Sequence, residues 1–133
     1  MAQDYRDLVV WQRAIELTVC VYKLTRVFPK DELYGLVSQM RRACASVASN
    51  IAEGRGGLNH AEFRQFLGLA QGSIYELQTQ LAVAGRLEIG RGAAFEEARS
   101  LSNEISKMIG AFIQTLSGPA RLTIVKEKLE ASS

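Results

Sequence analysis

The side chains best suited to bind a ligand in this 133-residue sequence are arginines, because a guanidinium group donates several hydrogen bonds to a phosphate. The candidates for nucleic-acid contacts are Arg13, Arg41, Arg42, Arg55 and Arg64. Phosphate contacts release counterions, so such binding weakens steeply as salt rises. The alternative for Arg41 and Arg42 is that they form a solvated edge, or pair with an acidic side chain of a neighbouring helix or subunit.

The overall charge gives this hypothesis little support. Sixteen Lys and Arg stand against fourteen Asp and Glu, a net charge of +2, whereas dedicated nucleic-acid-binding domains are strongly basic. The sequence contains no RNA-stacking motif, zinc finger or helix-turn-helix signature. The hypothesis therefore depends on arginines that cluster locally or are repeated around an oligomer.

A second polar group lies at the end of the stretch "RRACASVASNIAEG", Arg41–Gly54. Ser49 and Glu53 are four residues apart, so they lie on one face of a helix, next to Asn50. We interpret these side chains first as a hydrogen-bond cluster that fixes the turn after Gly54, and only second as a ligand site.

The same stretch is rich in small residues, since seven of its fourteen are Ala, Ser or Gly. Gly72 and Ser73 belong to a similar small-residue run later in the chain. Small side chains let helix backbones approach closely. This pattern predicts tight helix packing, either within one subunit or between subunits.

The sequence gives little support to catalysis. His60 is the only histidine, and its "HAE" matches the H-x-E of zinc deaminases but lacks the C-x-x-C that completes that site. The Glu-x-x-His motif of di-iron bundles, a phosphate-binding loop and a nucleophile elbow are also absent. Cys20 and Cys44 lie in apolar segments and are expected in the core. We therefore predict no enzyme activity, no metal and no cofactor.

Apolar residues recur at spacings of three and four in four segments, a pattern typical of helices with one buried face. The four stripes are Val10, Ala14, Leu17, Val21, Leu24 and Phe28; Leu33, Val37, Met40, Cys44, Val47 and Ile51; Phe63, Leu67, Ala70, Ile74, Leu77, Leu81 and Ala84; and Ala94, Ala98, Leu101, Ile105, Met108, Phe112 and Thr115. Before the third stripe, Asn59 and Glu62 predict a capped helix start.

Four such helices with short connections predict an all-α fold, an up-down-up-down antiparallel four-helix bundle with a short C-terminal arm. The chain is expected to form one domain over residues 1–133. The predicted helices span about residues 8–28, 32–54, 60–88 and 93–117, and the arm spans residues 119–133.

The first helix has more apolar residues than one buried seam needs. Its second stripe consists of Trp11, Ile15, Val19 and Tyr22. This stripe is either the edge of a wide core-facing arc or a subunit interface, where Trp and Tyr are favoured. No window approaches the roughly eighteen apolar residues of a spanning helix, and the charged N-terminus lacks the apolar run of a signal peptide. We expect a cytoplasmic protein without membrane contact.

Two segments also resemble a known family. "RRACASVASNIAEG" (Arg41–Gly54) and "EFRQFLGLAQGSIYELQTQL" (Glu62–Leu81) are similar to motifs of the four-helix bundle proteins encoded in intervening sequences of bacterial large-subunit ribosomal RNA genes. The same family includes the accessory variability protein of diversity-generating retroelements. The resemblance extends from about Leu8 to Ala84.

The resemblance implies a bacterial, non-enzymatic protein that assembles into a ring-like homopentamer and binds RNA or DNA, or a protein partner such as the reverse transcriptase that the retroelement relative engages. The family's paired arginines correspond to Arg41 and Arg42 of this sequence. Its signature turn corresponds to Ser49, Asn50, Glu53 and Gly54. The chain departs from the family pattern in two places, because Gly56 and Gly57 stand where many relatives carry Arg or Lys, and Gln78 replaces a frequent Glu.

Overall fold

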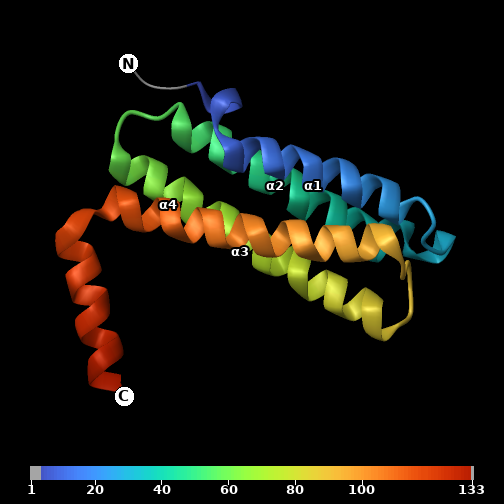
Figure 1. The fold of residues 1–133 in the computed structure, drawn as a ribbon. Helices are drawn as coiled ribbons and strands as arrows, with labels where there is room; N and C mark the ends of the chain where they lie inside the picture. The colour runs from blue at the N-terminus through green and yellow to red at the C-terminus, as the bar shows by residue number, and fades with distance from the viewer. Residues whose placement is uncertain (1–3, 133) are drawn as a thin grey trace.

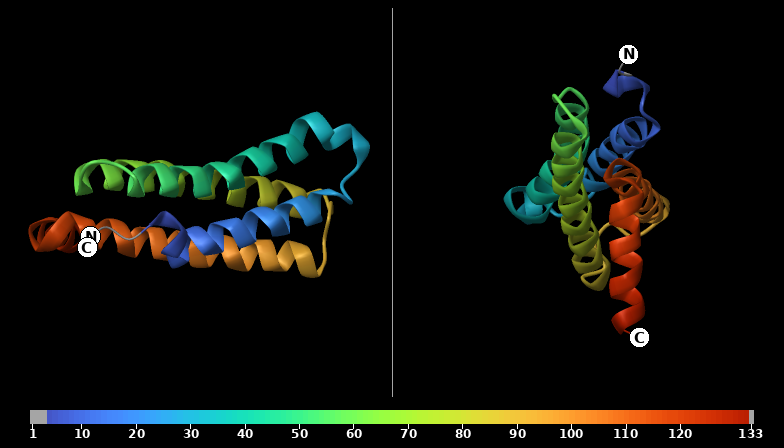
Figure 2. Two further views of the ribbon diagram at one scale, coloured as in Figure 1. Left: turned by 90° about the horizontal axis from the view of Figure 1, so that it is seen from above. Right: turned by 90° about the vertical axis from the view of Figure 1, so that its left-hand side faces the viewer.

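The computed structural model describes the backbone of residues 4–132 and the side chains of residues 4–117. The described residues form four α-helices. The helices are α1 Val9–Thr25, α2 Ser38–Arg55, α3 His60–Arg86 and α4 Ala93–Ser132. Consecutive helices run in opposite directions (Figure 1). Seen from above, α2 and α3 form one layer and α1 and α4 the other (Figure 2, left), and each helix contacts two others. These contacts confirm the predicted four-helix bundle.

The second predicted helix does not begin at residue 32, because the backbone is irregular before Ser38. A 3-10 turn at Lys30–Glu32 is followed by a π-helical turn at Leu33–Val37, and Gly35 adopts non-helical angles (φ −104°, ψ −107°). The Glu32 carboxylate accepts the N–H of Leu36 at 3.3 Å. The break turns residues 33 and 34 outward, so the prediction that Leu33 joins the core is wrong, since its exposure is 48%.

The buried faces predicted for α1 and α3 are confirmed. Their buried residues include Val10, Ala14, Leu17, Val21 and Leu24 on α1, and Phe63, Leu67, Ala70, Ile74, Leu77, Leu81 and Ala84 on α3. Cys20 and Cys44 are also buried, with free thiols, as predicted. Within the described residues, no helix has both the length and the apolar character needed to cross a membrane.

The buried face of α4 is rotated by about one position from the prediction. Ala98 and Ile105 are buried as predicted, and Phe95, Ser102 and Ile109 are buried beside them. The predicted Leu101 and Met108 are half-buried, and Thr115 is exposed. The α4 helix packs against both α1 and α3. Its buried face therefore lies between the side chains that contact α1 and those that contact α3.

The start of α3 agrees with the predicted cap. The Asn59 side chain accepts the N–H of Glu62 at 2.9 Å, and the Glu62 carboxylate accepts the N–H of Leu58 at 3.2 Å. Both contacts satisfy backbone donors at or next to the helix start. The chain therefore enters α3 directly after the short turn that ends α2.

The predicted boundary after residue 117 is not a helix end, because α4 continues to Ser132. Its last part turns away from the bundle (Figure 1, red; Figure 2, right). A proline inside a helix removes one backbone hydrogen bond and bends the axis, and Pro119 lies within this helix. The predicted C-terminal arm is thus a helical extension of α4, with side chains that lie outside the described residues.

Candidate nucleic-acid interface

Arg13 is neutralised by two carboxylates. Its Nη1 lies 3.0 Å from Glu16 on the same helix, and its Nε lies 3.1 Å from Glu104 on α4. The hydrogen bond and charge of Glu16, followed by the charge of Glu104, raise the pKa of the Arg13 guanidinium above its ordinary value. Arg13 therefore links α1 to α4, and its charge is already balanced within the bundle.

Arg64 and Arg55 also contact the protein itself. The Nη1 of Arg64 donates to the carbonyl of Leu116 at 2.9 Å, which links α3 to α4. The guanidinium carbon of Arg55 lies 5.8 Å from the centre of the Phe63 ring, across the turn between α2 and α3. These two residues lie at the end of the bundle opposite to the start of α2, so the structure does not gather the five candidate arginines on one surface.

Arg41 is held in place by neutral partners. Its Nε donates to the Thr25 hydroxyl at 2.9 Å, and its guanidinium carbon lies 4.5 Å from the centre of the Tyr22 ring. A cation over an aromatic face is attracted by the electrons of the ring. Because neither partner is acidic, the guanidinium is oriented but keeps its positive charge.

Arg42 is exposed and lines two surface grooves. In the part of the chain that the structure describes, no carboxylate forms an ion pair with Arg42 or with Arg41. One groove, of about 440 Å³, lies beside the start of α2. It is lined by Tyr22, Leu33, Tyr34, Val37, Ser38, Arg41, Arg42 and Ala45, which we call the Arg41–Tyr34 surface.

Tyr34 was missed by sequence reasoning, although it stands out in the structure. Its side chain is 92% exposed and lies next to the backbone break at Gly35. The available signal was the glycine in "LYGLV", inside an otherwise helical pattern. Tyrosine stacks on nucleic-acid bases while arginine contacts phosphates, so the Arg41–Tyr34 surface has the chemistry to bind a single strand.

The predicted Ser49–Glu53 cluster is replaced by one centred on Ser46. Asn50 Nδ2 donates to the Ser46 carbonyl at 2.9 Å and to its hydroxyl at 3.0 Å, and the Ser73 hydroxyl donates to the same oxygen at 3.0 Å. Ser49 and Glu53 are exposed, and no hydrogen bond joins them among the described side chains. The small-residue stretch thus connects α2 to α3 by a polar link.

Gly54 is required for close packing of α2 on α3. A Cβ atom at this position would lie 2.7 Å from Phe66 Cβ and 3.0 Å from Phe63. Gly72 differs, because a Cβ atom there would meet no atom within 4 Å. Of these two glycines, Gly54 alone has a packing reason within the single chain.

The second apolar stripe of α1 stays partly uncovered. Trp11 is half-buried and packs edge-on against Tyr5, with ring centres 5.2 Å apart. Ile15, Val19 and Tyr22 are 38%, 48% and 41% exposed. A wide core-facing arc accounts for Trp11 but not for these three.

Comparisons with known proteins extend over most of the chain. The family model described as 23S rRNA-intervening sequence protein matches residues 6–111. Among solved structures, the chain is similar to a protein of unknown function from the S23 ribosomal protein family of Bacteroides thetaiotaomicron, with a TM-score of 0.72 and 23% identity. The similarity covers 80% of this chain and 96% of that chain, and at this identity it shows the shared fold alone. Among curated proteins, none matches the sequence.

Proposed function

The chain belongs to the 23S rRNA-intervening sequence protein family, and from this premise we propose that it is a non-enzymatic protein that binds nucleic acid through Arg41 and Arg42. The observation that carries the proposal is that these adjacent guanidinium groups have no carboxylate partner in the described part of the chain. Since Cys20 and Cys44 are free buried thiols, we propose that the protein acts in the reducing cytoplasm.

The Arg41–Tyr34 surface suits a single strand better than a duplex. Arg41 is already oriented by Thr25 and Tyr22, so it loses little conformational freedom on binding a phosphate. Arg42 is adjacent and exposed, and Tyr34 offers a ring on which a base can stack. Stacking and phosphate contacts read no base edge, so we expect binding that tolerates different sequences.

The proposal includes self-association, in the ring-like homopentamer that the family resemblance implies. The uncovered Ile15 and Val19 on α1 are the apolar surface that supports it. A closed ring would repeat Arg41 and Arg42 around its axis, so a net charge of +2 per chain would become a concentrated positive field.

A scaffold that binds a protein partner, such as a reverse transcriptase, is the second candidate function. The observation in its favour is a set of exposed apolar side chains on α3, namely Leu69, Tyr75 and Val83. Such a protein would tolerate the loss of charge at Arg41 and Arg42, whereas a nucleic-acid binder would not.

Binding can be measured by fluorescence anisotropy with a labelled single-stranded RNA, a hairpin RNA and a duplex DNA at low salt. We expect the single strand to bind most tightly, and Arg41→Gln with Arg42→Gln to weaken it by about 100-fold through two lost phosphate contacts. The matched control is Arg6→Gln with Lys107→Gln, which removes the same charge from exposed positions elsewhere. Equal binding by both double variants would reject the proposal.

Self-association can be tested by light scattering on Ile15→Arg, because a charge in an apolar interface is left without a partner. The expected result is a monomer mass for this variant and the wild-type assembly for Ser100→Arg, which places the same charge on an exposed polar position of α4. An unchanged mass for Ile15→Arg would exclude this stripe as the interface.

A further inference from the structure

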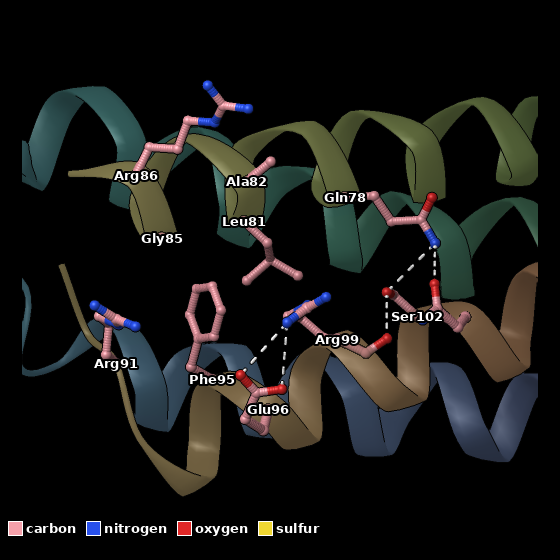
Figure 3. A pocket seen from close by; sticks show the side chains of 11 residues that line it. Gln78, Leu81, Ala82, Gly85, Arg86, Arg91, Phe95, Glu96, Arg99 and Ser102 are labelled. Carbon is pink, nitrogen blue, oxygen red and sulfur yellow. Dashed lines mark hydrogen bonds and ion pairs between the residues drawn. The ribbon is translucent and has the colours of Figure 1, made fainter. Parts of the chain in front are cut away.

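A groove of about 510 Å³ lies between the end of α3 and the start of α4 (Figure 3). Three arginines from separate segments line it: Arg86 ends α3, Arg91 lies in the connection, and Arg99 lies on α4. Glu96 is the one acidic side chain in the lining. The groove is therefore positively charged at the end of the bundle where α3 passes into α4.

These arginines are weakly held. Arg91 lies 3.6 Å from Glu88 and Arg99 lies 3.4 Å from Glu96, and all four side chains are more than half exposed. Exposed ion pairs of this kind contribute only about 0–1 kcal/mol. Arg86 forms no ion pair within the described residues. An anionic ligand can thus recruit all three guanidinium groups without breaking a strong contact.

The middle of the groove is apolar. Leu81 and the Phe95 ring point into it from opposite helices (Figure 3). Gly85 allows the ring to lie against α3, since a Cβ atom there would be 3.2 Å from Phe95 Cζ. Ala82 adds a second small residue to the α3 wall. Small residues on one wall and buried apolar side chains below leave room for a ring to lie on this floor.

The far end of the groove has polar groups with unused hydrogen-bonding capacity. Gln78 Nε2 donates to Asn103 Oδ1 at 3.0 Å, and Ser102 lies beside them. Gln78 Nε2 also donates to the Ser102 hydroxyl at 3.5 Å, so both amide donors of Gln78 are used. The Gln78 carbonyl oxygen and the Asn103 amide group form no hydrogen bond among the described residues, so they are available to a ligand. A donor next to an acceptor is the pattern that reads the edge of a nucleobase.

We propose that this groove binds a nucleoside phosphate. The phosphate lies between Arg91 and Arg99, with Arg86 at the rim of the groove, and the base lies over the apolar floor toward Gln78. The ligand is either a free nucleotide or the terminal nucleotide of a strand, since both carry the same chemistry. The inference is independent of the proposed function, because no residue of the Arg41–Tyr34 surface lines this groove.

Titration of the full chain with adenosine 5′-monophosphate, followed by isotope-edited NMR, tests the proposal. We expect saturable shifts confined to the groove, with adenosine and inorganic phosphate each binding at least about tenfold more weakly, since each lacks half of the contacts. Binding of the nucleotide no tighter than that of inorganic phosphate would overturn the proposal.

Variants separate this site from the Arg41–Tyr34 surface. Arg91→Gln with Arg99→Gln should weaken nucleotide binding by about 100-fold, and Ala82→Phe should block the groove while it keeps every charge. Arg41→Gln with Arg42→Gln is the control and should bind the nucleotide as wild type does. Unchanged binding by folded Arg91→Gln with Arg99→Gln, checked by circular dichroism, would reject the assignment.

Two short RNA strands that differ only in a 5′-phosphate or a 5′-hydroxyl identify the source of the ligand. If the groove holds a strand terminus, only the phosphorylated strand produces the groove shifts seen with the mononucleotide. If it holds free nucleotides, neither strand does. Both patterns support the site, whereas equal groove shifts with the two strands would contradict a role for the terminal phosphate.

Discussion

At the end of the bundle where α2 passes into α3, arginines hold helices together, whereas at the opposite end they face grooves. Arg64 donates to a backbone carbonyl of α4 at this end, and Arg13, nearer the middle of the bundle, is paired with two carboxylates. At the opposite end, Arg41 and Arg42 have no acidic partner among the described residues, and Arg91 and its neighbours form only long, exposed pairs. The same residue type therefore stabilises one end and leaves the other able to bind anions.

Two helix glycines, Gly54 near one end of the bundle and Gly85 near the other, differ in what a Cβ atom would meet, and the largest predicted effect concerns Gly54. Gly54→Ala should lower the free energy of unfolding by about 1–3 kcal/mol, because its Cβ would lie 2.7 Å from Phe66 Cβ, an atom that the backbone fixes. Urea denaturation measures this change.

Gly85→Ala at the opposite end is the matched control. Its Cβ would meet the far edge of the Phe95 ring at 3.2 Å, and a small ring shift relieves that contact. Alanine also favours the helix by up to about 1 kcal/mol over glycine. We expect a stability within about 0.5 kcal/mol of wild type, and a loss as large as that of Gly54→Ala would show that the two ends are equally tightly packed.

Arg13→Gln and Arg42→Gln should change different properties, the first the stability and the second the binding of RNA. Arg13→Gln should lower stability by about 0–1 kcal/mol, since its ion pairs are partly exposed, and leave RNA binding unchanged. Arg42→Gln should leave stability unchanged and weaken RNA binding by about tenfold. Denaturation and anisotropy on both variants test this, and a stability loss confined to Arg42→Gln would reverse the assignment of roles.

Alkaline pH should lower the stability of the bundle through its two buried thiols. Burial raises the pKa of the Cys20 thiol from 9.0 to about 11, and burial likewise raises the pKa of Cys44. The folded state thus favours the neutral thiols, so stability is complete below pH 9 and falls as pH rises toward 11. Denaturation between these pH values checks the decrease, and Cys20→Ala should reduce it. A stability that rises over this range would contradict the account.

Periodicity predicted the helices well where each faces the core with a single stripe. Every stripe position on α3 from Phe63 to Ala84 is buried, as expected. The pattern was only partly right on α4, where Ala98 and Ile105 are buried as predicted but the centre of the buried face is shifted. This helix packs against two neighbours and buries the surface between two apolar stripes, and the sequence does not reveal that shift. The spacing pattern also gave a wrong prediction before Gly35. Leu33 has the helical spacing of a buried residue, but the backbone break at Gly35 is not visible in that spacing.

The roles of the arginines could not be predicted, because their partners are distant in sequence. Glu104 lies 91 positions from Arg13, and the Leu116 carbonyl lies 52 positions from Arg64. Arg86, Arg91 and Arg99 were not candidates, since no motif joins them and only the packing of α3 on α4 forms their groove. Arg41 and Arg42 were candidates because they are adjacent, but the exposure of Tyr34 beside them required the structure.

The most direct test is the salt dependence of binding to a single-stranded RNA, measured for wild type and for Arg41→Gln with Arg42→Gln. Each phosphate contact contributes about 0.7 to the slope of log K against log salt for a single strand. We predict that the double variant loses about 1.4 from the slope for each bound subunit, while Arg6→Gln with Lys107→Gln keeps the wild-type slope. A double variant with the wild-type slope would show that these arginines do not contact the nucleic acid.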